Sequence, residues 1–156
     1  MRRASATVTI PGVRIADAEA LWYDVTRWSS FIEGFKHVVR IEGDWPAAGS
    51  RIIWQSVPDG RGRVSEQVTA YVQREGQTAD VVDPRISGRQ SITFAAAQGP
   101  EDQRGTAMTL QLEYTLCDGG PLGAVTDLLF IRRAQADALR RTLQRFAREL
   151  QAEREL

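Results

Sequence analysis

The first 35 residues combine one alternating segment with two stretches of helical spacing. Residues 4–10 alternate apolar and hydroxyl side chains, which predicts a half-buried strand that ends at Pro11-Gly12. Asp17 is predicted to cap a helix that runs to about Val25, and residues 28–35 predict a second short helix or turn. The buried stripe of the first helix is expected to include Leu21, Trp22 and Val25, and the second segment places Trp28, Phe31, Ile32 and Phe35 at helical spacing.

Strand patterns then dominate as far as Leu116, and turn signals separate them. Pro58-Asp59-Gly60 is a strong turn signal, while residues 84–88 and 98–105 are predicted to be loops. Together with residues 4–10 this gives seven strands, and their short connections favour an antiparallel meander because parallel neighbours need long crossovers. The six further strands are expected at residues 37–42, 50–57, 63–73, 78–82, 90–97 and 106–116.

A long helix is predicted after Gly119-Gly120-Pro121, which ends the last strand. A helix of roughly 30 residues would extend about 45 Å and could cross the whole sheet. Its apolar positions step mostly by three or four and form one stripe, which is most simply buried against one face of the sheet. The stripe consists of Leu122, Val125, Leu129, Ala136, Leu139, Leu143, Phe146 and Leu150.

Composition fits one globular domain over residues 1–156, with 42% hydrophobic and 26% charged residues. Twenty basic residues balance twenty acidic ones, and the arginines of the last helix alternate with acids, so we expect no nucleic-acid partner. No apolar run approaches the ~20 residues of a membrane-spanning helix. The first residues lack the apolar segment of a secretory signal, so a cytoplasmic location is expected.

Cys117 is the only cysteine and His37 the only histidine. A single cysteine excludes an internal disulfide and a multi-cysteine metal site, and a single histidine excludes a histidine cluster. We therefore expect neither a bound metal nor a cofactor. His37, beside Lys36 at the start of a strand, is expected at the surface, and Cys117 is expected to be an inert thiol.

The order of strand, two short helices, six strands and a long helix resembles the helix-grip fold of the START-like (SRPBCC) superfamily, and most closely its polyketide cyclase/dehydrase group. The resemblance implies an α+β fold in which a curved seven-stranded antiparallel sheet holds the long C-terminal helix over one face. It also implies a cavity between sheet and helix for an apolar small molecule. The residues that carry it are Ala16–Val25, Trp28, Phe31–Phe35, Gly62–Val68 and Gly119–Gly123.

Members of this group that cyclise polyketides use an arginine on the fourth strand and a tyrosine after the second helix. At the matching positions this chain has Gln67 and Phe35. Phe35 cannot exchange a proton and Gln67 can only donate a neutral hydrogen bond, so the resemblance assigns no catalytic residue.

The strand at residues 63–73 allows two orientations, because side chains alternate between faces. Its apolar positions favour burial of Val64, Val68, Ala70 and Val72, with Ser65 and Gln67 toward solvent, whereas the family alignment places Ser65 and Gln67 in the cavity. A bulge would change the alternation partway along the strand. The candidate ligand-binding residues are Trp28, Ile32, Phe35, Trp54, Ser65, Gln67, Ile92, Phe94, Leu110, Leu112 and Leu139.

We expect the chain to bind a hydrophobic small molecule, polyketide-like or lipid-like, in an internal cavity. A polyketide aromatase, cyclase or dehydratase is the alternative, and it requires an ionisable side chain in the cavity. A protein-interaction module is the third class, which an apolar surface patch and a closed interior would favour. A homodimer is compatible with all three. The ionisable candidates are Tyr71, Tyr114, His37, Arg63 and Glu66.

Overall fold

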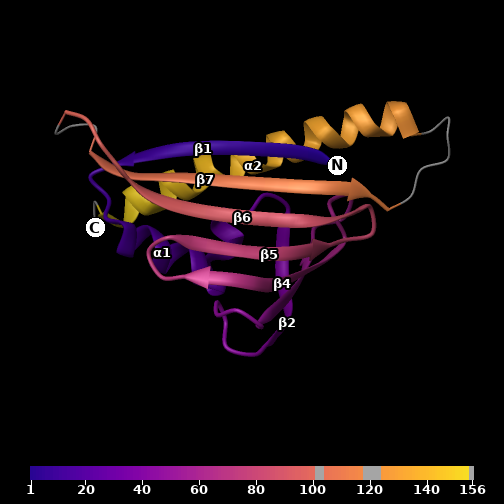
Figure 1. Ribbon diagram of the computed structural model, residues 1–156, viewed down its shortest axis with the longest axis horizontal. Helices are drawn as coiled ribbons and strands as arrows, with labels where there is room; N and C mark the ends of the chain where they lie inside the picture. Colours follow the sequence, from indigo (N-terminus) through magenta and orange to yellow (C-terminus); the bar gives the residue numbers. More distant parts are fainter. Residues whose placement is uncertain (101–103, 118–123, 155–156) are drawn as a thin grey trace.

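Seven strands form one curved sheet, and a long helix runs along it (Figure 1). The structure, a computed structural model, describes residues 1–100, 104–117 and 124–154, without the side chains of residues 124–130. The elements are β1 (Arg2–Pro11), α1 (Ile15–Tyr23), the 3-10 helix η1 (Val25–Ser30), β2 (Phe35–Glu42), β3 (Arg51–Ser56), β4 (Arg63–Val72), β5 (Gly76–Val82), β6 (Ile86–Ala97), β7 (Gly105–Leu116) and α2 (Ala124–Arg154).

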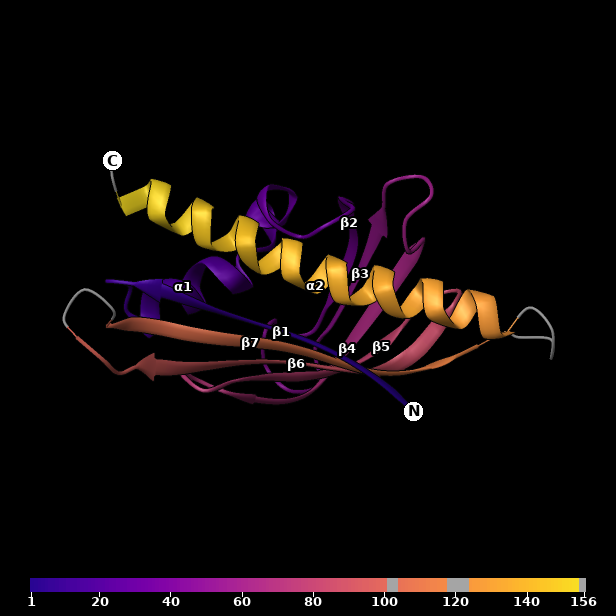
Figure 2. The ribbon, with the colours of Figure 1, turned by 90° about the horizontal axis from the view of Figure 1, so that it is seen from above.

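The strand order is β1-β7-β6-β5-β4-β3-β2, and every neighbouring pair is antiparallel. Thus β2 to β7 form a meander, while β1 pairs with β7 and becomes one edge. Seen from above, α2 crosses the sheet diagonally, with α1 near its C-terminal half and the ends of β3, β4 and β5 near its N-terminal half (Figure 2). This arrangement confirms the predicted helix-grip architecture.

The core lies between the sheet and the C-terminal half of α2. Leu139, Leu143, Phe146 and Leu150 are buried, so the described part of the predicted stripe faces the sheet. The ring of Phe146 meets Trp22 edge-on at 5.5 Å between ring centres. The sheet contributes alternate side chains of β7, because successive residues of a strand face opposite sides. The large side chains buried on β7 are Met108, Leu110, Leu112 and Tyr114.

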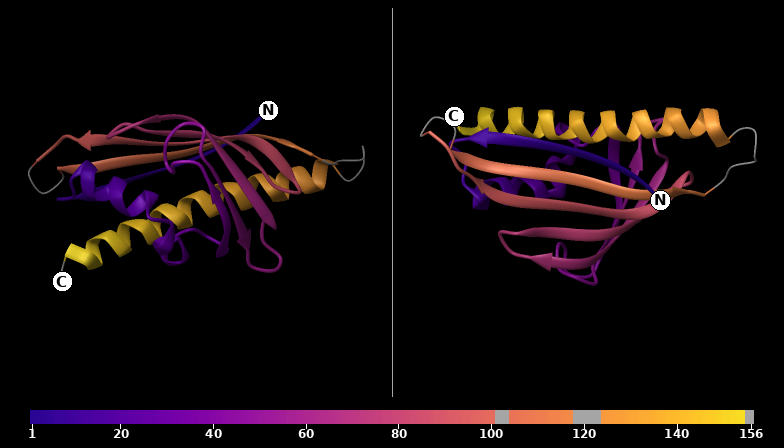
Figure 3. Two further views of the ribbon diagram at one scale, coloured as in Figure 1. Left: turned by 90° about the horizontal axis from the view of Figure 1, so that it is seen from below. Right: turned by 45° about the horizontal axis from the view of Figure 1, so that its top comes forward.

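Ion pairs join the C-terminal half of α2 to the segment around η1. Arg27 pairs with Glu149 at 2.5 Å and also with Glu153. Farther along the segment, the backbone N–H of Glu33 donates to the hydroxyl of Thr142 at 3.0 Å. This half of α2 is therefore attached to its surroundings by polar contacts as well as by apolar packing. The view from below shows both short helices beside it (Figure 3).

Three local expectations were wrong in detail. The first helix begins at Ile15, and Asp17 pairs with Arg14 instead of capping the helix. The second helix is the 3-10 turn of η1, which Asp24 caps by accepting from the backbone N–H of Thr26. Strand β6 begins at Ile86, within a predicted loop. Gly88 permits this because a Cβ there would lie 1.9 Å from the carbonyl oxygen of Glu113 on β7.

Some predictions fall outside the described part of the chain. These are the turn at Gly119-Gly120-Pro121 and the stripe positions Leu122, Val125 and Leu129. Among the described residues, no helix is both long and apolar enough to cross a membrane.

Candidate functional site

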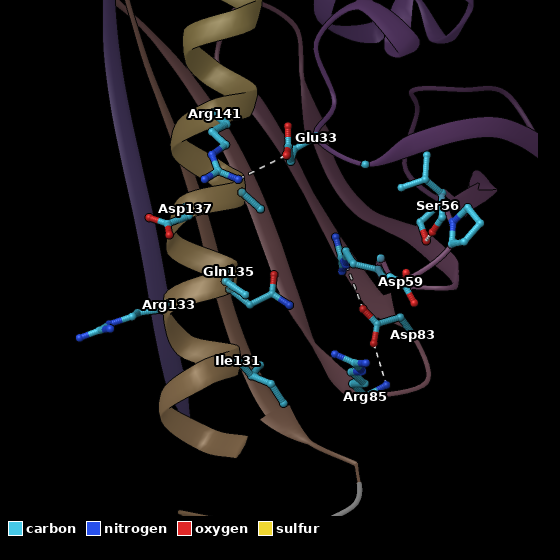
Figure 4. Close-up of a pocket in the computed structure, with 17 residues that line it drawn as sticks. Glu33, Ser56, Asp59, Asp83, Arg85, Ile131, Arg133, Gln135, Asp137 and Arg141 are labelled. Carbon is cyan, nitrogen blue, oxygen red and sulfur yellow. Dashed lines mark hydrogen bonds and ion pairs between the residues drawn. The ribbon is translucent and has the colours of Figure 1, made fainter. Parts of the chain in front are cut away.

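A cavity of about 610 Å³ lies beside α2, at the end of the sheet where β3 and β4 are joined. One wall is α2 and the other consists of the β3–β4 turn and the β5–β6 turn. Figure 4 shows Ile131 and Gln135 projecting from α2 toward the side that carries Asp59 and Asp83. We call this cavity the cleft. Its lining consists of Glu33, Gly34, residues 56–61, Asp83, Arg85, Ile131, residues 133–135, Asp137, Ala138 and Arg141.

The β3–β4 turn is shaped by residues that tolerate unusual backbone angles. Asp59 has a φ of 68°, a left-handed conformation that aspartate accepts more readily than most residues. The hydroxyl of Ser56 accepts a hydrogen bond from the backbone N–H of Gly62 at 2.8 Å. Val57 donates its backbone N–H to the carbonyl of Gly34 at 2.8 Å, which ties the turn to the segment that precedes β2. The turn is therefore positioned from both sides.

Asp83 organises the opposite corner of the cleft. One of its carboxylate oxygens accepts from the backbone N–H groups of Arg85 at 2.8 Å and Ile86 at 2.9 Å. The other accepts from Nε of Arg61 at 2.9 Å. The guanidinium of Arg61 also lies over Trp54, with Cζ 5.8 Å from the ring centre. Thus one buried carboxylate fixes both turns and holds Arg61 in the wall of the cleft.

The charges around the cleft are balanced. Four carboxylates and four guanidinium groups line it. Among them, Glu33 pairs with Arg141 at 3.5 Å and with Arg145, outside the lining, at 3.0 Å. A balanced lining gives no net attraction for an ion of either sign, so apolar contact is left as the main source of affinity. Its uncharged side chains include Val57, Pro58, Ile131, Ala134 and Ala138.

The interior beyond the cleft is packed with aromatic rings. Trp28 is 3% exposed and donates its indole N–H to the carbonyl of Trp22 at 2.9 Å. Its ring meets Phe35 and Trp45 edge-on, at 6.0 and 5.7 Å between centres. Phe35 packs in turn on Trp54 at 5.6 Å. Trp28 and Phe35, predicted to bind a ligand, are therefore part of a packed aromatic cluster.

A second cavity, of about 20 Å³, lies inside this cluster. Glu66 reaches it from β4 and is buried. One oxygen of Glu66 accepts from the indole N–H of Trp54 at 2.7 Å, and the other accepts from Nε2 of Gln90 at 3.4 Å. Burial raises the pKa of the Glu66 carboxyl, opposed by the hydrogen bond from Trp54 and by the charge of Arg61. The cavity is lined by Trp22, Trp28, Ile32, Trp45, Glu66, Gln77, Ala79, Gln90 and Ile92.

Strand β4 has the first of its two possible orientations, but only over its first half. Val64, Glu66 and Val68 are buried, so Ser65 and Gln67 face away from the interior. Gln67 instead bonds to Arg51 and to the carbonyl of Gly49, at 2.9 and 3.0 Å. A bulge between Val68 and Ala70 then shifts the register, so Ala70 and Val72 are exposed where burial was expected. Ser65 and Gln67 thus cannot contact a ligand inside the fold from this strand.

The predicted ligand-binding residues do not line the cleft. Trp28, Ile32 and Ile92 border the small cavity. The others on the inner face belong to the core or its margin, namely Phe35, Trp54, Phe94, Leu110, Leu112 and Leu139.

The ionisable candidates divide between interior and surface. Glu66 and Tyr114 are buried, and burial raises the pKa of the Tyr114 hydroxyl. Tyr71 is half-buried beside Tyr23, at 5.5 Å between ring centres. His37 and Arg63 are exposed. Cys117 is exposed, and within the described ranges no group of three metal-ligating side chains comes together.

Sequence reasoning missed the residues of the cleft because most of them are charged, small or in turns. One signal was available on the last helix. Ile131, Ala134, Gln135 and Ala138 occupy positions i, i+3, i+4 and i+7 of one helix face and form a second row beside the buried stripe. A row in which three of four residues are small or apolar, between arginines, indicates a face that is only partly exposed to solvent.

Comparisons with known proteins agree with this architecture. The profile of a family described as polyketide cyclase / dehydrase and lipid transport matches residues 1–151. No curated protein matches the chain significantly.

Solved structures share the fold at low sequence identity. The protein TTHA0849 from Thermus thermophilus has a TM-score of 0.72 and 16% identity, covering 97% of this chain and 99% of that protein. SA2116 from Staphylococcus aureus, a protein of unknown function, has a TM-score of 0.69 and 11% identity, with coverage of 99% and 98%. A point mutant of norcoclaurine synthase from Thalictrum flavum, in complex with a transition-state analogue, has a TM-score of 0.67 and 10% identity, with coverage of 98% and 96%.

Proposed function

Because the chain belongs to the polyketide cyclase/dehydrase and lipid transport family, we propose that it binds an apolar small molecule, polyketide-like or lipid-like, in the cleft beside α2. The observation that carries this proposal is the cleft itself. Its volume of about 610 Å³ lies within the ~300–1,000 Å³ of typical small-molecule sites. The aromatic interior is the weaker candidate, because its cavity measures only about 20 Å³.

The lining suits a ligand that is mainly apolar. Ile131, Ala134 and Ala138 on α2 oppose Val57 and Pro58 on the β3–β4 turn. Covering roughly 200 Å² of apolar ligand surface would contribute about 5 kcal/mol before the cost of association is subtracted. Gln135, whose side chain points into the cleft, supplies a polar contact that would orient the ligand (Figure 4).

A neutral fluorescent probe tests this function. N-phenyl-1-naphthylamine is expected to gain fluorescence in the presence of the protein, and lipids or polyketide-like aromatics that occupy the cleft should displace it. Ala138→Trp fills the cleft from α2 and should weaken probe binding at least tenfold. Ala20→Trp, at an exposed position of α1, is the matched control and should bind the probe like the wild type. Equal affinity of the Ala138→Trp variant would contradict the assignment, and absence of probe binding would favour a protein-interaction module.

Catalysis on a carbonyl-rich chain is the second candidate, and one observation favours it. Glu66 is a buried carboxyl whose pKa is raised by burial, as a general acid requires. It does not line the cleft, and its own cavity measures about 20 Å³, so this activity requires the aromatic cluster to open before a substrate can contact Glu66. Conversion of a poly-β-ketone thioester, followed by chromatography, tests this activity. If Glu66 donates the proton, Glu66→Gln should lower the rate of conversion at least a hundredfold and leave probe binding in the cleft intact. Equal rates in the two proteins would exclude Glu66 from the reaction.

A further inference from the structure

The small cavity inside the aromatic cluster has three polar side chains, and their known partners leave hydrogen-bonding capacity unused. Gln77 donates from Nε2 to the carbonyl of Pro46 at 3.1 Å. Gln90 donates from Nε2 to Glu66 at 3.4 Å, which is a long contact. In the described part of the chain, neither glutamine side-chain oxygen accepts a hydrogen bond from another residue. Each amide nitrogen also has a second hydrogen to donate.

The indole N–H groups around this cavity can only donate, so they cannot accept the second amide hydrogens of the glutamines. Three of them already donate to other groups. The N–H of Trp28 donates to the carbonyl of Trp22, and the N–H of Trp45 donates to the carbonyl of Tyr23 at 3.0 Å. Trp54 donates to Oε2 of Glu66, whereas Gln90 donates to Oε1. The glutamine oxygens can accept a further hydrogen bond and the second amide hydrogens can donate one, so the cavity suits a partner that both donates and accepts.

We propose that this cavity is a binding site for a single water molecule. Its volume of about 20 Å³ exceeds the ~10–15 Å³ that one water requires, and larger molecules do not fit. Glu66, Gln77 and Gln90 give the water two to four partners, the number that buried waters usually have. The water donates to Glu66 and to a glutamine oxygen, and it accepts from a glutamine N–H.

This water serves Glu66 in either protonation state. An ionised carboxylate accepts a hydrogen bond from the water, and a protonated carboxyl donates one to it. Glu66 therefore keeps a partner when it gains or loses its proton, inside a cluster where an unpaired polar atom would be costly. The inference is independent of the ligand in the cleft.

Two measurements on the intact protein test the site. A high-resolution crystal structure should show one density peak within hydrogen-bond distance of Glu66 and of Gln77 or Gln90. In solution, oxygen-17 magnetic relaxation dispersion should detect the same long-lived water. Ala79 lines the cavity, so Ala79→Val places two methyl groups in it and should remove both signals. Ala4→Val, buried on β1 away from the cavity, is the matched control and should retain them.

Each outcome decides the question. Loss of one long-lived water in the Ala79→Val protein alone supports the site. A wild-type crystal without the peak, or an unchanged relaxation signal in the folded Ala79→Val protein, would overturn it. A peak that gives anomalous signal after rubidium is added would replace the water by a monovalent cation and also overturn the proposal. Should the Ala79→Val protein fail to fold, the wild-type crystal and relaxation data still decide.

Discussion

Replacing Asp83 by alanine should destabilise the protein more than any other carboxylate change near the cleft. Three hydrogen bonds are lost together, two from backbone N–H groups and one from Nε of Arg61. The side chain of Asp83 is 2% exposed, so water cannot readily replace them, whereas that of Arg61 is 21% exposed and is partly hydrated after the change. Breaking a buried pair costs about 3–5 kcal/mol, and the exposure of Arg61 places the expected cost near the lower end.

Urea denaturation followed by tryptophan fluorescence measures this cost. A loss of about 3 kcal/mol corresponds to a fall in Tm of roughly 6–12 °C for a domain of this size. Asp83→Asn keeps an acceptor for the backbone N–H groups but loses the charge, so we expect about 1–2 kcal/mol.

Asp80→Ala is the matched control for Asp83→Ala. Asp80 pairs with Arg89 at 3.6 Å on the exposed face of the sheet, and its side chain is 52% exposed. Such a surface pair contributes about 0–1 kcal/mol. If Asp83→Ala and Asp80→Ala unfold at the same urea concentration, the buried carboxylate does not organise the two turns and the reasoning fails.

Three further changes test other parts of the structure. Because burial raises the pKa of Glu66, the folded state holds that proton more tightly than the unfolded state. As pH rises above the usual carboxyl range, the wild type should therefore lose stability relative to Glu66→Gln, by at most about 1.4 kcal/mol per pH unit. Parallel stability curves of the two proteins between pH 4 and 8 would contradict this. Phe146→Ala removes a fully buried ring that contacts Trp22 and Phe31, and it should lower the free energy of unfolding in urea by about 3–5 kcal/mol. A decrease of less than about 1 kcal/mol would show that α2 is not anchored at this ring. Glu149→Gln breaks a half-exposed pair with Arg27 and should lower the free energy of unfolding by less than about 1 kcal/mol, with the largest effect at low salt. A larger decrease that persists in high salt would contradict a surface ion pair.

The architecture was predictable because it rests on repeated patterns. Strict alternation at residues 4–10 and in β7, and the helical stripe from Leu139 to Leu150, each involve many residues that agree. Helix starts were less predictable because a single side chain decides them. Asp17 lies in the first turn of α1 and pairs with Arg14, whereas Asp24 caps η1.

The site was harder to predict because it depends on distant segments. Nothing local to Asp83 indicates that Arg61 will reach it across two turns. The bulge after Val68 reverses which residues of β4 face inward, and neither Ala70 nor Val72 signals it. Glu66 was named among the ionisable candidates, but its burial follows from partners on β3 and β6, Trp54 and Gln90, which only the folded sheet brings near.

The two halves of helix α2 make different contacts. From Leu139 onward it secures the fold through Phe146 and the Arg27 pairs, while residues 131–138 contribute mainly to the wall of the cleft. Exposed wall residues such as Ala134 can be substituted at little risk to folding, because Phe146 and the Arg27 pairs lie at least two turns farther along the helix. Ile131 instead packs against the core, and Gln135 is buried. Under the proposed function, engineering of new binding preferences is best begun at Ala134, which lines the cleft without taking part in the core.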